Sequence, residues 1–460
     1  MKASIVIVAD DLTGAADCGV VCTAAGLSTV VVLNDAARAR DLSTEAIAFD
    51  ADTRHQTSEQ ASAATERAVR QLCSANATRV LYKKIDSTLR GNFAVEIAAA
   101  RKAASLLSHR SQIAVARPLA IVAPAFPAAG RTTIGGRMFV QGIPLEETEI
   151  WRNEGIRGIA DLPPLLEQKG GLRTASIELE TVRSGAQAMA AAFTKYAAGN
   201  IEAVVCDAVT EDDLGIIAGA AAQLEYPALF AGSAGLARYL PETFGLTRNI
   251  DPHSSRGPIQ LADNERNQSA LGSAPLVHLP SSPNGRLLFV VGSMSQASRE
   301  QFRRLENDPS VRLFAISPGT LRAGPDSGRW RQARNSIEEA IDLGHDIGVT
   351  VDLNPGINLN ESTFLSDSLA QLLMPVLQQF GGLFCTGGET ARALLDAAGA
   401  VGMRLIGEIE PGIPLGITEG GPRLAIVTKA GAFGTAQTLL HCRTALQRFL
   451  DQRNPAVTGE

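Results

Sequence analysis

One stretch of the chain, residues 80–92, joins a short apolar strand pattern to an abrupt run of charged and hydroxyl side chains. Val80-Leu81-Tyr82 leads into two lysines and then into Ile85-Asp86-Ser87-Thr88-Leu89-Arg90-Gly91-Asn92. The polar residues come where a strand gives way to a loop, which is where α/β proteins bind their ligands. Two lysines and an arginine beside one carboxylate suit an anionic substrate. A solvated strand end of mixed charge is the alternative interpretation, and it is weakened because the pattern recurs.

Three further strand patterns end in the same way. Residues 4–9 form an apolar run that stops at Asp10 and Asp11, of which a helix cap needs only one. Residues 47–49 lead to a polar cluster that contains Arg54, a planar two-pronged donor for carboxylate or phosphate. Residues 121–123 lead through a proline-rich loop to Arg131. Together the four strand ends predict one site for a small polyhydroxylated anion.

Alternation of β-rich and alanine-rich segments predicts the fold class. Up to about Leu240, short apolar runs alternate with helical stretches, which is typical of βα units on a parallel sheet. A second series of such units begins at residue 286. We therefore expect an α/β protein of two domains, each a mostly parallel sheet flanked by helices, with the active site in the cleft between them. The expected boundaries are 1–240, a Pro- and Ser-rich linker at 241–285, a second domain at 286–450, and a tail at 451–460.

The predicted elements have definite ranges. Helices are expected at 58–75, 93–107, 186–198, 296–305 and 363–380. Besides the strand ends above, strands are expected at 29–33, 203–206, 228–231, 286–291, 311–316, 347–351, 382–385 and 425–428.

Composition favours an ordinary metabolic enzyme. The net charge of −6, with 20% charged residues, argues against nucleic acid as a partner. No apolar run approaches the roughly 20 residues that span a bilayer, and Met1-Lys2 leads straight into a strand pattern, so we expect neither a membrane span nor a secretory signal. The cytoplasm is the expected location. The six cysteines form no CxxC pair, and Cys18 and Cys22 are expected to be small buried hydrophobes.

Two glycine-containing loops in the second half indicate phosphate binding. Thr386-Gly387-Gly388-Glu389-Thr390 lies between a strand and a helix pattern, where backbone N–H groups and the helix dipole favour an anion. A further strand pattern ends at Lys429-Ala430-Gly431. The GxxxxGK[ST] and GxGxxG fingerprints are both absent. A nucleotide would therefore be held by Ser293, the turn from Gly387 to Thr390, and the Gly431 loop together.

These motifs, in this order, resemble the four-carbon acid sugar kinases. The resemblance rests on residues 9–15, Lys83-Lys84-Ile85-Asp86-Ser87-Thr88, residues 124–131, Val291-Gly292-Ser293 and residues 386–390, and it spans nearly the whole chain. It implies an N-terminal acid-sugar domain, a C-terminal nucleotide domain, and ATP-dependent phosphorylation of the C4 hydroxyl of a tetronate. The Lys-Ile-Asp-Ser form is more similar to D-threonate or D-erythronate kinases than to 3-oxo-tetronate kinases, whose block usually reads Tyr-Lys-Tyr-Cys-Ser-Thr-Phe.

The chain departs from the family pattern after Glu149. Where members commonly continue with an Ala-Arg-Asp-Pro-like run, this chain has Ile150-Trp151-Arg152-Asn153-Glu154. The departure leaves open which tetronate is the substrate, including its stereochemistry. The oligomeric state is open as well, with a homo-oligomer as one alternative.

The residue patterns and the family resemblance together predict roles for individual side chains. Arg54, Lys84 and Ser87 would hold the carboxylate and hydroxyls of the sugar acid, with Arg131 also at the site. Lys84 is expected to be essential, and one carboxylate among Asp10, Asp11 and Asp86 would accept the proton of the attacking hydroxyl. Mg²⁺ is expected to bridge the ATP phosphates, with its protein ligands unknown. Glu389 would reach the metal or a ribose hydroxyl, or would only complement the helix dipole.

The sequence is also compared with three alternative functions. A non-catalytic sugar-acid binding protein would not need the glycine loops. A dehydrogenase would need the missing dinucleotide fingerprint. A 3-oxo-tetronate kinase would keep every loop and change only the sugar pocket.

Overall fold

The computed structural model describes residues 3–36, 42–74, 77–108, 118–248, 259–260, 285–293, 295–352, 361–431 and 433–453. The chain divides into two compact units, Met1–Arg248 and Asn249–Glu460, and each is described by itself. Most of the expected linker, at 249–258 and 261–284, and the end of the expected tail, at 454–460, lie outside the described residues. The domain boundaries and an active site between the domains therefore stay predictions.

The first unit is built on an eight-stranded sheet in which every neighbouring pair is parallel. Most of its strands are buried along their whole length, because helices cover both faces and water reaches neither. This explains why they appear in the sequence as continuous apolar runs. In spatial order the strands are β2 (Thr29–Val32), β3 (Ala46–Asp50), β1 (Ile5–Ala9), β4 (Val80–Lys84), β11 (Ala228–Gly232), β5 (Leu119–Ala123), β10 (Ala203–Cys206) and β9 (Thr174–Ile177).

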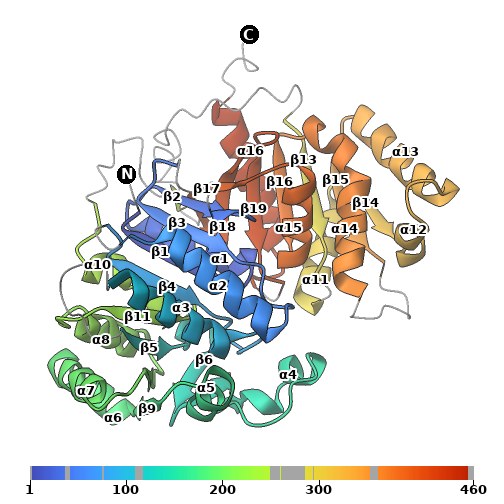
Figure 1. The fold of residues 1–460 in the computed structure, drawn as a ribbon. Coiled ribbons are helices and arrows are strands. Elements are labelled where there is room, and N and C mark those ends of the chain that lie inside the picture. The colour runs from blue at the N-terminus through green and yellow to red at the C-terminus, as the bar shows by residue number, and fades with distance from the viewer. Residues whose placement is uncertain are drawn as a thin grey trace. The chain divides into compact units, whose positions relative to one another are not determined.

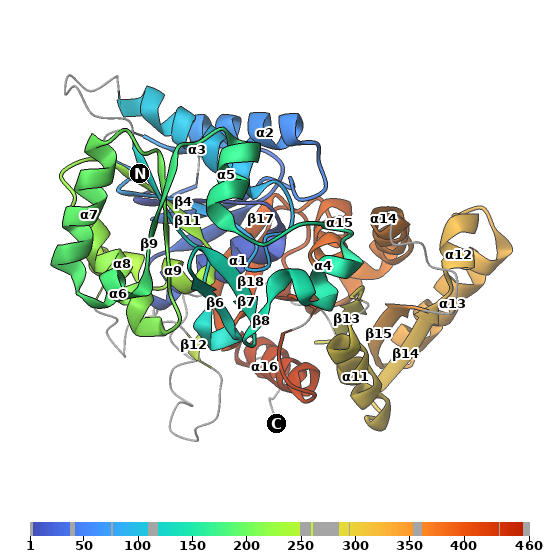
Figure 2. The ribbon, with the colours of Figure 1, turned by 90° about the horizontal axis from the view of Figure 1, so that it is seen from below.

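Two helical layers enclose this sheet (Figures 1 and 2). One layer contains α2 (Ser58–Leu72), α3 (Phe93–Ser108) and α5 (Leu162–Gly170), and the main hydrophobic core of the unit lies between it and the sheet. The other layer contains α1 (Leu12–Ala24), α9 (Ala234–Ala237), α8 (Glu211–Ala221), α7 (Ala186–Ala198) and α6 (Leu179–Arg183). Buried alanines such as Ala100 and Ala103 on α3 allow the close helix-on-sheet packing that the low aromatic content requires. Cys18 and Cys22 are buried and free, as expected.

A small antiparallel sheet follows the proline-rich loop, and the sequence analysis did not foresee it. It contains β6 (Arg131–Ile134), β7 (Arg137–Val140) and β8 (Ile143–Pro144). Its first turn is formed by Gly135 and Gly136, both with positive φ, as a two-residue hairpin turn requires. Their amides donate to the buried Asp207 carboxylate at 2.7 and 2.9 Å, so the hairpin is fastened to the carboxyl end of β10.

The second unit has a mixed sheet, parallel over most of its width. Its spatial order is β14 (Val311–Ile316), β15 (Asp346–Val351), β13 (Leu287–Val291), β16 (Gly382–Thr386), β19 (Ala425–Lys429), β18 (Ile413–Glu419) and β17 (Gly402–Glu410), with β12 (Ile259–Gln260) beside β17. The first five strands are parallel, whereas β18 and β17 pair antiparallel. The predicted class of two α/β domains with mostly parallel sheets is therefore confirmed.

Helices cover both faces of the second sheet as well (Figure 2). One face carries α13 (Gly328–Asp342), α14 (Ser362–Leu373) and α15 (Gly388–Ala397), with α12 (Pro318–Ala323) against α13 and α14. The other carries α11 (Gln296–Arg304) and α16 (Thr438–Arg453). The expected helix at 363–380 is α14 followed by a separate 3-10 turn, Met374–Gln379, because Pro375 follows the end of the helix. A short helix, α10 (Leu240–Thr243), lies where the linker was expected to begin. No helix in the described ranges is long and apolar enough to cross a membrane.

Candidate active site

Parallel pairing brings the predicted polar strand ends of the first unit together. Ala9 at the end of β1 is in register with Asp50 of β3 on one side and with Lys84 of β4 on the other. The residues that follow these strands therefore emerge at one edge of the sheet. The amides of Thr53 and Arg54 donate to the Asp10 carbonyl, and the Asn92 side chain donates to the carbonyls of Thr53 and Gln56. These contacts fix the loop that carries Arg54.

Arg54 gathers three carboxylates, Asp10, Asp11 and Asp86, which we call the acid cluster. Its Nε donates to Asp10 Oδ2 at 2.8 Å, its Nη1 to Asp11 Oδ2 at 2.6 Å, and its Nη2 lies 3.9 Å from Asp86 Oδ1. The guanidinium is largely buried, with a side-chain exposure of 13%. Arg54 thus holds side chains from three separate loops in one arrangement, and its donors are already engaged by protein carboxylates.

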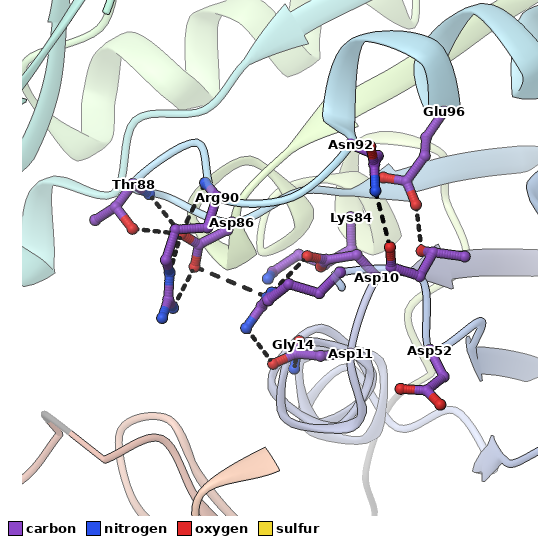
Figure 3. Close-up of polar contacts among 12 residues, drawn as sticks. Asp10, Asp11, Gly14, Asp52, Lys84, Asp86, Thr88, Arg90, Asn92 and Glu96 are labelled. Carbon is purple, nitrogen blue, oxygen red and sulfur yellow. Dashed lines mark hydrogen bonds and ion pairs between the residues drawn. The ribbon is translucent and has the colours of Figure 1, made fainter. Parts of the chain in front are cut away.

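Asp86 is the most heavily bound member of the acid cluster (Figure 3). Arg90 donates to it from Nε at 2.8 Å and Nη2 at 3.0 Å, the Thr88 amide donates at 3.2 Å, and the Thr88 hydroxyl also donates to it. Burial would raise the pKa of Asp86, but Arg90, Arg54 and Lys84 outweigh burial and hold that pKa well below its usual value. Asp86 is therefore ionised at neutral pH, where it anchors two arginines and is a weak proton acceptor.

Asp10 is the most deeply buried of the three acids, with a side-chain exposure of 2%. Burial would raise its pKa, whereas Arg54, Lys83 and Lys84 lower it, and the net direction is down. Its Oδ1 is buried and has no hydrogen-bond partner within the described part of the chain.

Asp11 has the most accessible carboxylate of the cluster. Its side chain is 18% exposed, compared with 11% for Asp86. It is the N-cap of α1, where its Oδ1 accepts from the Gly14 amide at 2.8 Å, while its Oδ2 faces Arg54. It is thus the carboxylate of the cluster that a bound hydroxyl reaches most easily.

Lys84 carries a buried charge without a protein partner. The residue is 5% exposed, and among the described residues no hydrogen-bond acceptor or carboxylate lies within bonding distance of its Nζ. Burial would lower its pKa, but the neighbouring Cys18, Asp10 and Asp11 raise that pKa overall, so the ammonium stays protonated. It also lies at the positive end of the α1 dipole, which favours an anion there. An unpaired buried cation in this position indicates that an anionic ligand completes the site.

The Lys83 side chain lies on the opposite face of the sheet from that of Lys84, because successive side chains of a strand alternate between the two faces. It is fully buried, and its Nζ lies 3.3 Å from Glu96 Oε2 in the first turn of α3. Thr53, next to Arg54, donates its hydroxyl to the other Glu96 oxygen. Burial, assisted by Asp10, raises the pKa of Glu96 in spite of Lys83. Sequence reasoning missed this pair, although a carboxylate among apolar helix residues was a signal for it.

The remaining residues predicted for the sugar site lie around Asp86. Ser87 is half-buried in the loop after β4, and no partner for its hydroxyl is found in the described ranges. Burial lowers the pKa of Arg131. Asp86 raises this pKa and Arg90 lowers it further, so these two residues are the charged neighbours of Arg131. Arg131 donates to the Ala129 carbonyl, and its buried Nε has no acceptor within the described chain. Arg90 belongs to the motif at residues 80–92, but the sequence did not indicate that it is the main partner of Asp86.

The segment that departs from the family pattern also contacts this loop. It forms the short helix α4 (Glu149–Asn153), in which the buried Trp151 donates its Nε1–H to the Thr88 carbonyl at 2.9 Å. Just after α4, Glu154 lies 3.6 Å from Arg90. The departure therefore supports the backbone and one arginine of the Asp86 loop.

In the second unit, three of the residues predicted to bind nucleotide meet in one place. A Cβ added to Gly431 would overlap Ser293 Oγ, and a Cβ on Gly387 would lie 3.5 Å from Ser293 N. Gly387 has φ of 96° and is the N-cap of α15, with no side-chain cap on the helix. The first turn of α15, which contains Gly388 and Thr390, therefore lies beside Ser293, and the N-terminus of a helix favours an anion.

Thr390 and Glu389 contribute differently to this helix end. Thr390 is buried, and its hydroxyl lies 3.1 Å from that of Ser366, so it packs α15 against α14. Glu389 is half-buried in the first turn of α15. No cluster of three or more metal-binding side chains occurs in the described ranges.

Comparison with known proteins supports the division of roles between the two units. Residues 5–240 match a family model described as a sugar-binding N-terminal domain, and residues 288–439 match one described as a nucleotide-binding C-terminal domain. A D-threonate kinase of Cupriavidus necator is 40% identical over 458 residues, which are 99% of this chain and 100% of that protein. The chain belongs to the four-carbon acid sugar kinase family. The predicted sugar-acid kinase class is confirmed.

Other members of the four-carbon acid sugar kinase family are less similar. A D-erythronate kinase of Heliobacterium modesticaldum is 27% identical and covers 95% of this chain and 96% of its own length. A 3-oxo-tetronate kinase of Methylobacterium radiotolerans is 26% identical and covers 95% and 97%. The solved structure of a Haemophilus influenzae protein of the DUF1537 family superposes with a TM-score of 0.68 at 20% identity, covering 96% of this chain and 100% of that one. This last comparison shows that the fold is shared.

Proposed function

We propose that this kinase transfers the γ-phosphoryl group of ATP to the C4 hydroxyl of D-threonate or D-erythronate. The observation that carries the proposal is the buried, unpartnered ammonium of Lys84 beside the acid cluster. A neutral sugar would leave this charge unpaired, whereas the carboxylate of a sugar acid neutralises it. Greater identity to a D-threonate kinase than to a 3-oxo-tetronate kinase supports the same substrate class.

In this proposal Lys84 binds the substrate carboxylate, and Ser87 and Arg131 bind neighbouring oxygens of the sugar acid. Arg54 orients the carboxylates of the acid cluster and does not bind the substrate, because its donors already face Asp10, Asp11 and Asp86. Asp86 in turn holds Arg90 and Arg54 in place. The substrate is thus bound by a preorganised set of charges that does not have to rearrange.

Asp11 is the proposed proton acceptor. The C4 hydroxyl donates a hydrogen bond to its carboxylate, the hydroxyl oxygen forms a bond to the γ-phosphorus, and the bond from that phosphorus to the β-γ bridging oxygen breaks. The proton passes to Asp11, and ADP leaves with the bridging oxygen. Asp86 is a poorer acceptor because its arginine partners hold its pKa well below the usual value and its side chain is less exposed than that of Asp11, and Asp10 is buried.

ATP would be held through its phosphates by the amides at the start of α15 and by the Ser293 and Gly431 loops. Bound ATP supplies the phosphoryl group, and Mg²⁺ would enter on its phosphates. The proposal assigns no protein ligand to the metal, because the described residues gather no ligand set. A cytoplasmic location and the meeting of the sugar and nucleotide sites stay predictions.

ADP release measured with a panel of C4 to C6 sugar acids tests the function. We expect turnover with a tetronate and none with the matching neutral tetritol. Asp11→Asn is expected to lower kcat by about 100-fold or more, while calorimetric binding of the sugar acid persists. Preferred turnover of 3-oxo-tetronate would replace the proposed substrate. Binding of a tetronate without any ADP release would favour a non-catalytic binding protein.

A further inference from the structure

Lys429, at the end of β19, directs its ammonium into the protein and toward the loop that follows it. The residue is 1% exposed. Its Nζ lies 3.0 Å from the Ala430 carbonyl oxygen, 3.1 Å from that of Gly431 and 3.0 Å from that of Phe433. A lysine beside a glycine loop commonly reaches a phosphate directly, but this one is occupied by backbone carbonyls.

Uncharged side chains from α11 hold the same carbonyls. Ser298 and the adjacent Ser295 donate to the Gly431 oxygen at 2.7 and 2.6 Å. Gln301 donates to the carbonyl oxygens of Phe433 and Thr435 at 3.2 and 2.8 Å. The carbonyls of Ala430, Gly431, Phe433 and Thr435 are therefore turned inward, toward Lys429 or α11.

The orientation of the carbonyls fixes the orientation of the amides, because C=O and N–H point in opposite directions across a planar trans peptide. The inward carbonyls of Ala430 and Phe433 turn the N–H groups of Gly431 and Gly434 away from Lys429. No acceptor for these two amides is found within the described residues. Amides that face away from the protein and lack a protein acceptor are available to bind an anion.

The Gly431 end of this loop lies at the predicted nucleotide site. Ser293 lies beside both Gly431 and Gly387, so the loop adjoins the N-terminus of α15. Phosphate oxygens bound at the start of α15 would therefore reach the Gly431 loop as well.

We propose that Lys429 is a positioning residue for the phosphate site: its ammonium holds the loop carbonyls inward, and the loop amides thereby face the ATP phosphates. Lys429 does not itself touch the nucleotide. The inference rests on the proposed function, since it requires ATP at this site.

Titration of Lys429 gives this role a pH signature. Burial lowers the pKa of Lys429 to about 8, in spite of Cys442 on α16 and Glu410 on β17. Cys442 stays a thiol, because burial raises its own pKa. Glu410 is bound by Thr438 and His441, and the groups that contact Nζ from α11 and the loop are uncharged. As pH rises through about 8, the loop loses the positive charge that orders its carbonyls.

The test is the KM for ATP measured in the full-length enzyme from about pH 7 to about pH 9.5 with saturating Mg²⁺, which keeps the terminal phosphate of ATP deprotonated across this range. We expect this KM to be flat below about pH 8 and to rise above it, while the KM for the sugar acid stays constant. Lys429→Met should raise the KM for ATP about tenfold at pH 7 and abolish its pH dependence.

Gln301→Leu is the matched control, because Gln301 holds the same loop without a charge. It should raise the KM for ATP and leave the pH dependence as in the wild type. A wild-type KM for ATP in Lys429→Met, or an unchanged pH dependence in that variant, would overturn the inference. If Lys429→Met does not fold, a wild-type KM for ATP that does not change with pH would overturn the inference. Failure of the wild-type enzyme to bind ATP in calorimetry would instead reject the proposed function.

Discussion

The ammonium of Lys84 lies against the α-carbon of Gly14 in the first turn of α1. A Cβ added at position 14 would stand 2.6 Å from Lys84 Nζ and 2.7 Å from Asp11 Oδ1. Glycine at this position therefore leaves room for both the cation and the carboxylate to which we assign substrate binding and proton transfer.

Gly14→Ala is accordingly expected to displace Lys84 and weaken sugar-acid binding. The KM for the tetronate should rise at least about tenfold, the equivalent of one lost charge-assisted hydrogen bond. The KM for ATP should not change. Gly328→Ala is the control, because a Cβ there meets no atom within 4 Å. Equal tetronate kinetics in the two variants would mean that Lys84 does not bind the substrate.

Asp86 provides a prediction about stability and pH. Asp86→Asn leaves two arginines short of an acceptor, and breaking such a buried ionic contact costs about 3 kcal/mol in the free energy of unfolding. The pKa of Asp86 in the folded state lies well below its ordinary value of 3.8. The Asp86 carboxylate therefore stabilises the folded protein fully above about pH 4, and this contribution is lost as the pH falls toward the folded-state pKa.

Chemical denaturation from about pH 3 to about pH 8 measures this effect. The difference between wild type and Asp86→Asn should be constant above about pH 5 and shrink below about pH 4. Glu66→Gln removes surface ion pairs with Arg70 and Lys102 and should cost at most about 1 kcal/mol. A difference that grew on acidification would show that Asp86 is protonated in the folded enzyme.

Local pattern was sufficient to predict the strands and the polar residues at their ends. Val80–Lys84 and Ala203–Cys206 are continuous apolar or strand-forming runs bounded by loops, and both are strands of a parallel sheet. Lys84, Asp10, Asp11 and Asp86 were identified because each follows or ends such a run.

Partners distant in sequence were not predictable in the same way. Glu96 is 43 residues from Thr53, and only the fold brings it beneath β4. Trp151 is 63 residues from Thr88, and nothing in its own segment indicates that contact. The β6–β8 sheet and the antiparallel β17–β18 pair were missed because pairing between strands is not encoded in local periodicity.

Trp151 is expected to support substrate binding through the Thr88 carbonyl. Trp151→Phe removes the N–H donor and should raise the KM for the tetronate severalfold, with a loss of about 1–2 kcal/mol in stability. Trp330→Phe, at a buried position of α13 in the second unit, should cost similar stability without any change in tetronate kinetics. Parallel kinetic losses in both variants would show that the effect of Trp151 is only global.

Gly387 and Gly344 form a matched pair for testing the nucleotide site. Their φ values are 96° and 93°, so alanine is strained at both and should destabilise each variant by about 1 kcal/mol. Only Gly387 adjoins Ser293 and the start of α15, whereas a Cβ at Gly344 meets no atom within 4 Å. Gly387→Ala is therefore expected to raise the KM for ATP about tenfold or more, because backbone strain displaces the amides that hold phosphate. Gly344→Ala should keep the wild-type KM. Thermal unfolding of both variants checks that their stability losses match, and an equal KM for ATP in the two variants would locate phosphate binding elsewhere in the chain.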